Sequence, residues 1–566
     1  LPSHAERYAR AEEFITVVKG LFDSCEDDAL VLDREAGLFY DPAKVHELNH
    51  EGDHFHIRGP LNLSRPPQGY PMLFQAGSSE PGRELAAATA DGGPALLLGA
   101  VRREDGKAYN AAYLLDDGVE AAVRRKHELP NYGVFDEKRV FAAGPLPGPV
   151  NFRGIRLGVP ICEDIWTADI CECLVETGAE LLIVPNGSPF EDGKFDVRLS
   201  HAVARVTETG LPLVYVNQVG GQDELVFDGG SFVVNGDCSL AVQMPTFDSG
   251  LVVTEWRLKD DAWVCAEGPR TAPHEGLSAL YRTMTLGLRD YVNKNRFPGV
   301  VLGLSGGIDS ALSAAVAVDA LGPDRVWCVM LPSKYSSAHS LDDAKACAEL
   351  LQCRLDEVTI EPAVAAFENM LADLFEGREA DITEENIQSR ARGMTLMAIS
   401  NKFGHMVLTT GNKSEMSVGY ATIYGDMCGG FSVLKDVYKI TAFELSRWRN
   451  QQRPEGALGP EGRVIPENTI TKPPSAELRP DQKDEDSLPP YEALDDILRC
   501  LVEEEMAFAD IVARGHEAET VRRIEHLLYL AEYKRRQAPP GVKLTARNFG
   551  RDRRYPITNG FRNARH

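Results

Sequence analysis

One cysteine occupies a position typical of a nucleophile. It is Cys162, which ends an apolar run in GVPICEDIW (158–166) and is followed by two acids and a tryptophan. A thiolate attacks an amide carbonyl effectively when a base removes the thiol proton and a cation stabilises the oxyanion. For a cysteine taken alone, a small buried core residue is the more frequent explanation. The stretch therefore raises the hypothesis of a thiol amidase, which requires a base elsewhere in the chain.

A second stretch, SGGIDS at 305–310, combines glycines, hydroxyls and a carboxylate. An apolar run at 300–304 precedes it, and an alanine-rich segment follows as far as Gly322, so the pattern predicts a buried strand, a tight turn and a helix. Unpaired backbone N–H groups at such a helix start bind phosphate. The carboxylate of Asp309 can hold a magnesium ion that bridges phosphates. Because the Gly-Lys-Ser/Thr of a Walker loop is absent, this is a different phosphate loop.

A third stretch, HMVLTTGNKSE at 405–415, is predicted to end a strand at 409–411 and to present Glu415 at a helix start. A carboxylate at that place can complete a magnesium site with Asp309. Further along, glycines and the cations Lys435 and Lys439 occur together in GDMCGGFSVLKDVYK, which suits the charge of a phosphate or an adenylate. An exposed lysine or arginine is more often a solvated surface charge, so these cations need support from a wider pattern.

The chain is long enough for several domains to position these groups. Its 566 residues predict two to four domains, and 43% hydrophobic with 26% charged residues is an ordinary globular composition. Before residue 275, apolar strands alternate with helices, which favours sheets covered by helices. Segments rich in Pro, Gly and charge at 248–276, 451–463 and 477–490 are the best linker candidates.

The composition also excludes some classes of partner. A formal net charge of −25 argues against a general nucleic-acid or anionic-membrane binder, because basic patches hold those partners. No apolar run approaches the ~20 residues that span a bilayer. The 11 cysteines are scattered and lack metal-ligand spacings, as expected for reduced thiols in a cytoplasmic protein.

The SGGIDS loop resembles that of the ATP pyrophosphatase group, and 385–440 resembles the NAD synthetase family. The resemblance covers about 275–566 and implies a doubly wound parallel-sheet domain, adenine nucleotide α hydrolase-like, at 271–566. It implies ATP binding by Gly303, Leu304, Ser305, Gly306, Gly307, Ile308, Asp309, Ser310, Thr410 and Lys439, and binding of nicotinate adenine dinucleotide (deamido-NAD) by Asn386, Arg390, Glu415 and Lys534. Asp309 and Glu415 would hold Mg²⁺. A tRNA-thiolating member of the group would carry a basic RNA-binding domain and further catalytic cysteines, and neither is evident.

The region at 91–270 resembles the nitrilase superfamily, in the form fused to NAD synthetases as a glutaminase. The resemblance implies that Cys162 is the nucleophile and that Lys126 stabilises the oxyanion. It assigns glutamine binding to Tyr132, Ser188 and Lys194. Ammonia would pass internally to the synthetase site. The expected fold is an incomplete nitrilase-like α/β sandwich, because its first strands are missing.

The family's base is a glutamate in an F-P-E-L-like motif before the lysine, and no such motif precedes Lys126. Glu80 and Glu84 are the nearest carboxylates, and each is expected to be an ordinary helix-start acid. Residues 1–90 instead resemble FMN-dependent, luciferase-like monooxygenases, with PMLFQAGSS (71–79) as a barrel strand and phosphate loop. A barrel fragment cannot close, which leaves open strand edges. We therefore expect neither productive FMN binding nor oxygenase activity.

Together these patterns predict an NAD synthetase that amidates deamido-NAD with ATP and releases AMP and pyrophosphate. Because the base is missing, we expect glutamine to support little or no activity, whereas ammonia supports the reaction. The alternative is an FMN-dependent monooxygenase, which rests only on the first 90 residues. The expected partners are small molecules, with neither nucleic acid nor membrane among them, and the family resemblance implies a homo-oligomer in the cytoplasm.

Overall fold

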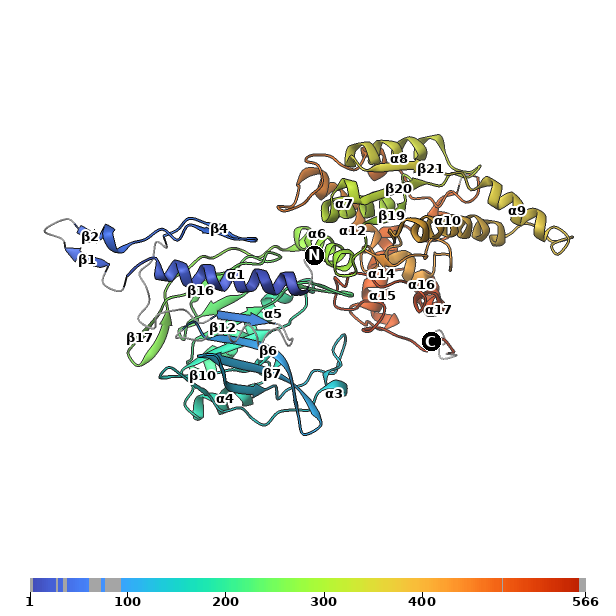
Figure 1. Ribbon diagram of the computed structural model, residues 1–566. Helices are drawn as coiled ribbons and strands as arrows, with labels where there is room; N and C mark the ends of the chain where they lie inside the picture. The colour runs from blue at the N-terminus through green and yellow to red at the C-terminus, as the bar shows by residue number, and fades with distance from the viewer. Residues whose placement is uncertain are drawn as a thin grey trace. The chain divides into compact units, whose positions relative to one another are not determined.

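The computed structural model describes residues 4–26, 29–33, 38–60, 73–76, 93–480 and 482–558. The chain forms two compact units (Figure 1). The first comprises residues 1–188, 195–218 and 229–273, and the second comprises 189–194, 219–228 and 274–566. Two short pieces from the first half of the sequence thus belong to the second unit.

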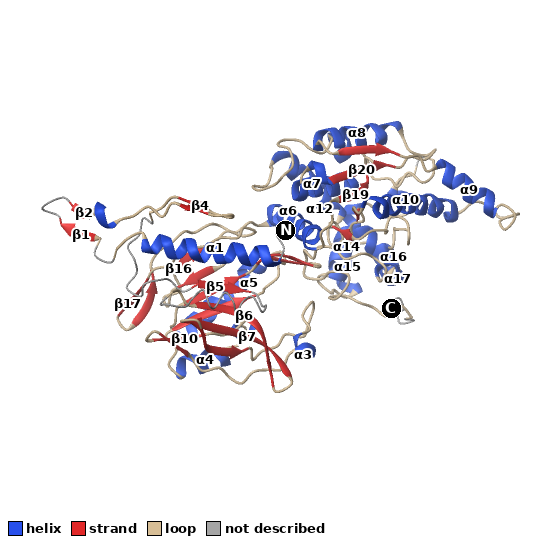
Figure 2. Ribbon diagram, viewed as in Figure 1, coloured by secondary structure: helices blue, strands red, loops and turns tan. Residues whose placement is uncertain are grey.

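The first unit contains a four-stranded sheet in the order β5-β6-β7-β8 (Figure 2). Its strands are β5 (Leu73–Ala76), β6 (Leu96–Glu104), β7 (Lys107–Asp116) and β8 (Val119–Arg125). β5 runs parallel to β6, and the other neighbours are antiparallel. A strand is therefore present within PMLFQAGSS, where it is the end strand of this sheet and pairs with β6.

Alternating side chains of this sheet divide between two hydrophobic clusters. Leu97 and Leu114 pack toward the six-stranded sheet, with Leu157 and Ile183. Their neighbours Leu96, Leu98, Ala111, Tyr113 and Leu115 pack with Ile15 of helix α1 (His4–Asp23). Because successive side chains of a strand point to opposite faces, this sheet is covered on both sides. The N-terminal helix is thus part of the unit's core.

The second sheet of this unit has six strands in the order β16-β15-β12-β11-β10-β9. They are β9 (Val150–Phe152), β10 (Ile155–Gly158), β11 (Leu181–Asn186), β12 (Leu213–Asn217), β15 (Phe232–Val234) and β16 (Leu240–Gln243). β10, β11 and β12 are parallel neighbours, so their carboxyl ends lie at one edge. Helices α4 (Asp169–Glu176) and α5 (Lys194–Thr209) contribute Leu174 and Val206 to the core on this sheet.

The unit's other elements are short. They are β1 (Leu30–Asp33), β2 (Leu38–Tyr40), η1 (Pro42–Lys44), β3 (His50–Glu51), β4 (His56–Ile57), α3 (Glu137–Val140), η2 (Cys162–Ile165), β17 (Trp256–Lys259) and β18 (Ala262–Cys265). β17 and β18 form a hairpin inside the segment 248–276 that was a linker candidate. In the parts of the chain that the structure describes, no helix is both long and apolar enough to cross a membrane.

The second unit is built on a five-stranded sheet in the order β21-β20-β19-β22-β23. Its strands are β19 (Val300–Gly303), β20 (Val326–Met330), β21 (Arg354–Glu357), β22 (Met406–Thr409) and β23 (Phe431–Ser432). All neighbouring strands are parallel. The order reverses between β19 and β22, and ligands of doubly wound sheets bind at the carboxyl ends beside such a reversal. The doubly wound fold predicted from the sequence is confirmed.

Helices surround this sheet, and a hairpin completes the unit. The helices are α6 (Gly276–Lys294), α7 (Ile308–Leu321), η3 (Pro323–Arg325), α8 (Ala338–Leu351), α9 (Glu361–Leu371), α10 (Ile382–Phe403), α11 (Lys413–Val418), α12 (Lys439–Gln451), α13 (Glu467–Thr471), η4 (Asp484–Asp486), α14 (Tyr491–Val502), α15 (Phe508–Ala513), α16 (Ala518–Leu530) and α17 (Glu532–Arg535). The hairpin consists of β13 (Val219–Gln222) and β14 (Leu225–Asp228). As predicted, α7 ends at Gly322, which has a φ of 84°.

Candidate active sites

A cavity of about 360 Å³ lies at the reversal point of the second unit's sheet. Its wall includes the loop after β19, the start of α11 and residues that precede α12. Of the predicted ATP-binding residues, the cavity is lined by Gly303, Leu304, Ser305, Gly307, Ile308, Asp309, Ser310, Thr410 and Lys439. Parallel β19 and β22 deliver two loops to one edge, which explains how distant stretches of sequence meet here.

Gly306, the remaining predicted ATP-binding residue, is not part of the cavity lining but allows α8 to approach the loop closely. Its φ is +79°, and a Cβ atom at this position would lie 2.2 Å from the backbone oxygen of Ser340. Only glycine allows both this conformation and this approach of α8. The hydroxyl of Ser305 lies 3.1 Å from that of Ser310, and the Ser310 hydroxyl donates to the Gly307 carbonyl at 3.0 Å. The loop is therefore held in shape before any phosphate binds.

A cation joins the two predicted magnesium ligands. The Nζ atom of Lys439 lies 2.6 Å from Asp309 Oδ2 and 3.1 Å from Glu415 Oε1. The Lys439 side chain is only 3% exposed, so it cannot be a solvated surface charge. Asn412 caps α11, accepts from the Glu415 backbone N–H at 2.9 Å and donates to Asp309 Oδ1 at 3.0 Å. The amide thus fixes both carboxylates relative to one another.

Burial dominates the electrostatics of this cluster. Burial, together with the carboxylates of Asp309 and Asp484, raises the pKa of Glu415 to about 8, although the Lys439 ammonium opposes the rise. The two neighbouring carboxylates in turn hold the pKa of Lys439 above its usual value, although burial alone would lower it. Perturbed groups gathered in a cavity are typical of a functional site.

These oxygen donors fit a magnesium ion. Mg²⁺ is usually bound by one or two carboxylates together with substrate phosphates, and Asp309 and Glu415 offer two carboxylates on the wall of one cavity. Among the residues that the structure describes, no three His, Cys, Asp or Glu side chains are grouped to hold a metal ion by themselves.

The four predicted deamido-NAD residues lie in two places. Glu415 lines the cavity. The other three contact the segment 419–423 beside it: Asn386 Oδ1 accepts from Thr422 at 2.9 Å, Arg390 donates to the Ile423 carbonyl at 3.3 Å, and Lys534 donates to the carbonyls of Gly419 and Ala421 at 2.7 and 2.6 Å. Because Tyr420 and Ala421 of that segment line the cavity, these residues support its wall.

Asp484 is a cavity residue that we did not predict from the sequence, because it lies in the linker candidate 477–490. It is buried and accepts from the Tyr491 hydroxyl at 2.9 Å. Glu477, in the same segment, accepts from the hydroxyls of Ser337 and Ser340 at 2.8 and 2.7 Å. The segment is thus a wall of the cavity, and its charge-rich composition reflects buried polar contacts.

In the first unit, Cys162 follows β10 at the carboxyl edge of the three parallel strands. Its φ of 51° is a left-handed conformation that non-glycine residues rarely adopt. Asp164, two residues on, accepts from the Ile161 backbone N–H at 2.9 Å and from those of His127 and Glu128 at 3.1 and 2.8 Å. One buried carboxylate therefore ties the turn that carries Cys162 to the segment that carries Lys126.

Lys126 is buried and paired with a carboxylate. Its Nζ atom lies 2.9 Å from Glu137 Oε2, and the two side chains are 2% and 20% exposed. Asn110 donates to the other oxygen of Glu137 at 3.3 Å. We did not predict Glu137 from the sequence. The signal that could have found it is an acidic residue in FDEKR, eleven residues after Lys126, which is close enough in the chain to pair with that lysine.

The three predicted glutamine-binding residues differ in surroundings. Tyr132 is exposed, and its hydroxyl donates to Glu163. Ser188 is buried just after β11, and its hydroxyl accepts from Arg198 at 3.0 Å. Lys194 begins α5 and belongs to the second unit. Glu80 and Glu84, the candidate substitutes for the missing base, lie outside the described residues.

Two protein families match this chain. The NAD synthase family matches residues 280–538, and the carbon–nitrogen hydrolase family matches residues 57–260. The second match begins within the segment 1–90 that is predicted to be a barrel fragment, so the boundary near residue 91 stays a prediction. Neither matching family is a flavin-dependent oxygenase, so the monooxygenase alternative is not supported.

Curated relatives match across both units. A glutamine-dependent NAD(+) synthetase from Rhodobacter capsulatus is 53% identical over 478 residues, which cover 84% of this chain and 86% of the relative. One from Thermotoga maritima is 41% identical over 512 residues, 85% of this chain and 88% of the relative. The solved structure of glutamine-dependent NAD+ synthetase from Acinetobacter baumannii in complex with ADP is 43% identical, with a TM-score of 0.65 over 85% of this chain and 88% of that one. The chain belongs to the glutamine-dependent NAD(+) synthetase family.

Proposed function

We propose that this protein converts deamido-NAD to NAD with ATP, releasing AMP and pyrophosphate. The observation that carries the proposal is the cluster of Asp309, Lys439 and Glu415 in a cavity at the reversal point of a parallel sheet. Membership of the glutamine-dependent NAD(+) synthetase family supports the choice of substrates. The phosphate loop and the buried cation supply what an anionic nucleotide needs.

In the first step, a carboxylate oxygen of deamido-NAD forms a bond to the α-phosphorus of ATP while the bond to the pyrophosphate oxygen breaks. The loop 305–310 and the start of α7 would bind the departing phosphates through backbone N–H groups. A bound Mg²⁺ would neutralise charge on these phosphates, held by Asp309 and Glu415. Lys439, which touches both carboxylates, would keep a positive charge beside the reacting phosphorus.

In the second step, ammonia attacks the acyl carbon of the adenylate, AMP leaves, and the nitrogen loses a proton to give the amide. Activation is required because a free carboxylate resists attack by an amine. The supports of the segment 419–423, which are Asn386, Arg390 and Lys534, would hold the wall against the nicotinate-bearing substrate. We assign these three residues to deamido-NAD binding.

The first unit would supply ammonia from glutamine. Cys162 would attack the glutamine amide to form a thioester, and Lys126, oriented by Glu137, would stabilise the oxyanion. Tyr132, Ser188 and Lys194 would bind the glutamine. Because no F-P-E-L-like glutamate precedes Lys126, we expect the rate with glutamine to be well below that with ammonia. We also expect a homo-oligomer in the cytoplasm.

The test is NAD formation by the full chain with ATP, Mg²⁺, deamido-NAD and either ammonium or glutamine. We expect NAD, AMP and pyrophosphate in equal amounts with ammonium. The Cys162→Ala variant should lose any glutamine-dependent rate and keep the ammonium-dependent one, whereas Asp309→Asn should lose both. No NAD with ammonium from folded protein would contradict the synthetase proposal.

A rate with glutamine equal to that with ammonium would contradict only the impaired amidase. Glu80→Gln and Glu84→Gln would then identify the carboxylate that replaces the family base. A Cys162→Ala variant that still uses glutamine would remove Cys162 from the proposed chemistry.

A further inference from the structure

Lys435 is a cavity-lining cation whose carboxylate partner comes from the other half of the sequence. Its Nζ atom lies 2.9 Å from Glu224 Oε1, and the two side chains are 8% and 22% exposed. The partners are 211 residues apart in the chain. Glu224 stands in the turn of the β13–β14 hairpin, inside the region that matches carbon–nitrogen hydrolases. Its carboxylate nonetheless belongs to the synthetase unit.

The hairpin is fixed to α6 of the synthetase unit by backbone contacts. The backbone N–H of Gly221 donates to Asp290 Oδ2 at 2.8 Å, and Lys294 donates to the Gly221 carbonyl. A Cβ atom at Gly221 would lie 3.1 Å from the Cα of Gly287, so glycines on both elements allow this close approach. The hairpin therefore has a defined position against α6.

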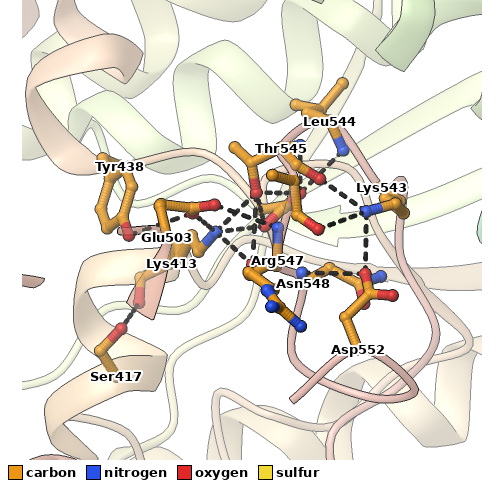
Figure 3. Close-up of polar contacts among 12 residues, drawn as sticks. Lys413, Ser417, Tyr438, Glu503, Lys543, Leu544, Thr545, Arg547, Asn548 and Asp552 are labelled. Atoms are coloured by element: carbon orange, nitrogen blue, oxygen red, sulfur yellow. Dashed lines mark hydrogen bonds and ion pairs between the residues drawn. The ribbon is translucent and has the colours of Figure 1, made fainter. Parts of the chain in front are cut away.

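The C-terminal segment, residues 540–552, provides a second set of contacts to the hairpin. The Lys543 backbone N–H donates to the Glu224 carbonyl at 2.8 Å. Figure 3 shows how this segment is held: the Lys543 ammonium bonds the Thr545 carbonyl at 2.6 Å and Asp552 at 2.8 Å. The Lys413 ammonium bonds the Thr545 hydroxyl at 2.7 Å and the Arg547 carbonyl at 2.8 Å. The buried ammonium groups of Lys543 and Lys413 thus hold in place the C-terminal segment, whose Lys543 N–H bonds the Glu224 carbonyl.

The side chain of Lys435 also packs against the C-terminal segment. A Cβ atom at Gly541 would lie 2.7 Å from the Lys435 Cβ and 3.0 Å from its Cδ, so the lysine stem packs directly on the C-terminal segment. Three residues earlier, the Ser432 backbone N–H donates to the Pro540 carbonyl at 2.9 Å, which holds the same two segments together. Within residues 93–480 and 482–558, Glu224 is the one carboxylate within ion-pair distance of Lys435.

We propose that Glu224 is a positioning residue of the synthetase site, which holds the Lys435 ammonium at the cavity wall to bind an anionic nucleotide. This inference rests on the proposed function. An ammonium group has three N–H donors, so one bond to Glu224 fixes its place and leaves two for phosphate or carboxylate oxygens. The amidase half of the sequence thereby completes the site of the ligase half.

The experiment is a double-mutant cycle in the full chain, with ammonium as the nitrogen source. Lys435→Gln, Glu224→Gln and the double variant are compared for kcat and for KM of ATP and deamido-NAD. We expect each single variant to raise KM for at least one nucleotide about tenfold with kcat within about threefold, because a binding interaction is lost. The double variant should be no worse than Lys435→Gln, because Glu224 acts only through Lys435.

Glu191→Gln is the matched control. Glu191 also comes from the first half of the sequence and lies 3.6 Å from Lys543, but it does not touch Lys435. It should leave both KM values unchanged. Additive effects of Glu224→Gln and Lys435→Gln, or unchanged KM in Glu224→Gln, would overturn the inference while NAD formation by the wild type leaves the proposed function intact.

If Glu224→Gln does not fold, as judged by its melting curve, Glu224→Asp replaces it in the same cycle. The aspartate keeps the charge and withdraws it by one methylene, so a raised KM with unchanged kcat supports positioning. An unchanged KM in a folded Glu224→Asp variant, together with an unchanged KM in Lys435→Gln, overturns it.

Discussion

At the scale of single residues, both candidate sites pair a buried lysine with carboxylates. Lys439 joins Asp309 and Glu415 in one site, and Lys126 contacts Glu137 in the other. A buried charge is costly unless it is paired, so each lysine depends on its partner for stability as well as for chemistry. The Lys126–Glu137 pair therefore makes a prediction that does not require catalysis to be measured.

The Lys126–Glu137 pair predicts a stability cycle. Glu137→Gln should destabilise the first unit by about 2 kcal/mol, because Lys126 stays buried while its counter-charge is lost, and Glu137 is itself partly exposed. Lys126→Met/Glu137→Gln should be more stable than the sum of its single changes predicts. Urea unfolding followed by hydrogen exchange of the amides in β8 and β10 measures this. Additivity in that cycle would show that the pair contributes no coupling.

Asp495 predicts a pH dependence of stability. It is 3% exposed, accepts from the Ile440 backbone N–H at 2.9 Å and from the Ser414 hydroxyl at 2.5 Å. Burial raises its pKa from 3.8 to about 6, against the effect of those hydrogen bonds. Because the folded pKa is the higher one, the ionised group costs stability as pH rises through that window, by about 3 kcal/mol in total.

Asp495→Asn removes this titration. The stability of the variant relative to the wild type should increase between about pH 4 and pH 7 and stay level above that. Denaturant unfolding at a series of pH values measures the difference. A difference that does not change with pH would show that Asp495 has an ordinary pKa in the folded protein.

At the scale of elements, the sequence was most informative where one element carries the whole signal. The strand, turn and helix around SGGIDS are local, so apolar runs and a C-terminal glycine were enough to predict them. Glu137 was missed because its significance is a contact with Lys126, which a polar loop does not reveal. Asp484 was missed because buried polar contacts give a segment the composition of a linker.

In the phosphate loop, we predict that an alanine at Gly306 lowers activity because its Cβ atom would collide with neighbouring backbone. Gly306→Ala should reduce kcat/KM with ammonium about 100-fold, because the new Cβ meets the Ser340 backbone and the loop must move. Gly404→Ala is the control, since its φ is +78° but its nearest neighbour, Pro298, lies at 3.8 Å. It should cost about 1 kcal/mol of stability and leave activity unchanged. Equal activity losses in both variants would contradict the role of the close contact.

At the scale of the whole molecule, units of structure and units of sequence differ. The family resemblance implied a domain beginning near residue 271, and the second compact unit of the structure comprises 274–566 together with the pieces 189–194 and 219–228. These two pieces cross that boundary, because their stabilising partners are Asp290, Lys435 and Lys543, which follow much later in the chain. No pattern within a short window carries such information.

Because the hairpin belongs to the second unit, we predict that the fragment 274–566, which lacks it, is less stable to heat than the same unit in the full chain. Without the hairpin, Lys435 and Asp290 lose Glu224 and the Gly221 N–H. Its melting temperature should fall at least about 5 °C below that of the corresponding transition in the full chain carrying Cys162→Ala. Calorimetry and the ammonium-dependent rate, measured side by side, test this. A fragment as stable and active as the full chain would show that the hairpin is dispensable.

The hairpin also limits where genes of this family can recombine without loss of the Glu224–Lys435 pair. An exchange of gene segments that replaces the amidase half of this chain with that of a distant relative would replace Glu224 and its supporting turn as well, while Lys435 stays behind. Recombinants would therefore survive best when the breakpoints spare residues 219–228 or when both donors carry the same charge pair. Exchanges confined to residues before β6 leave this charge pair untouched, so the pair sets no limit on them, whereas any exchange that includes residues 219–228 must supply its own partner for Lys435.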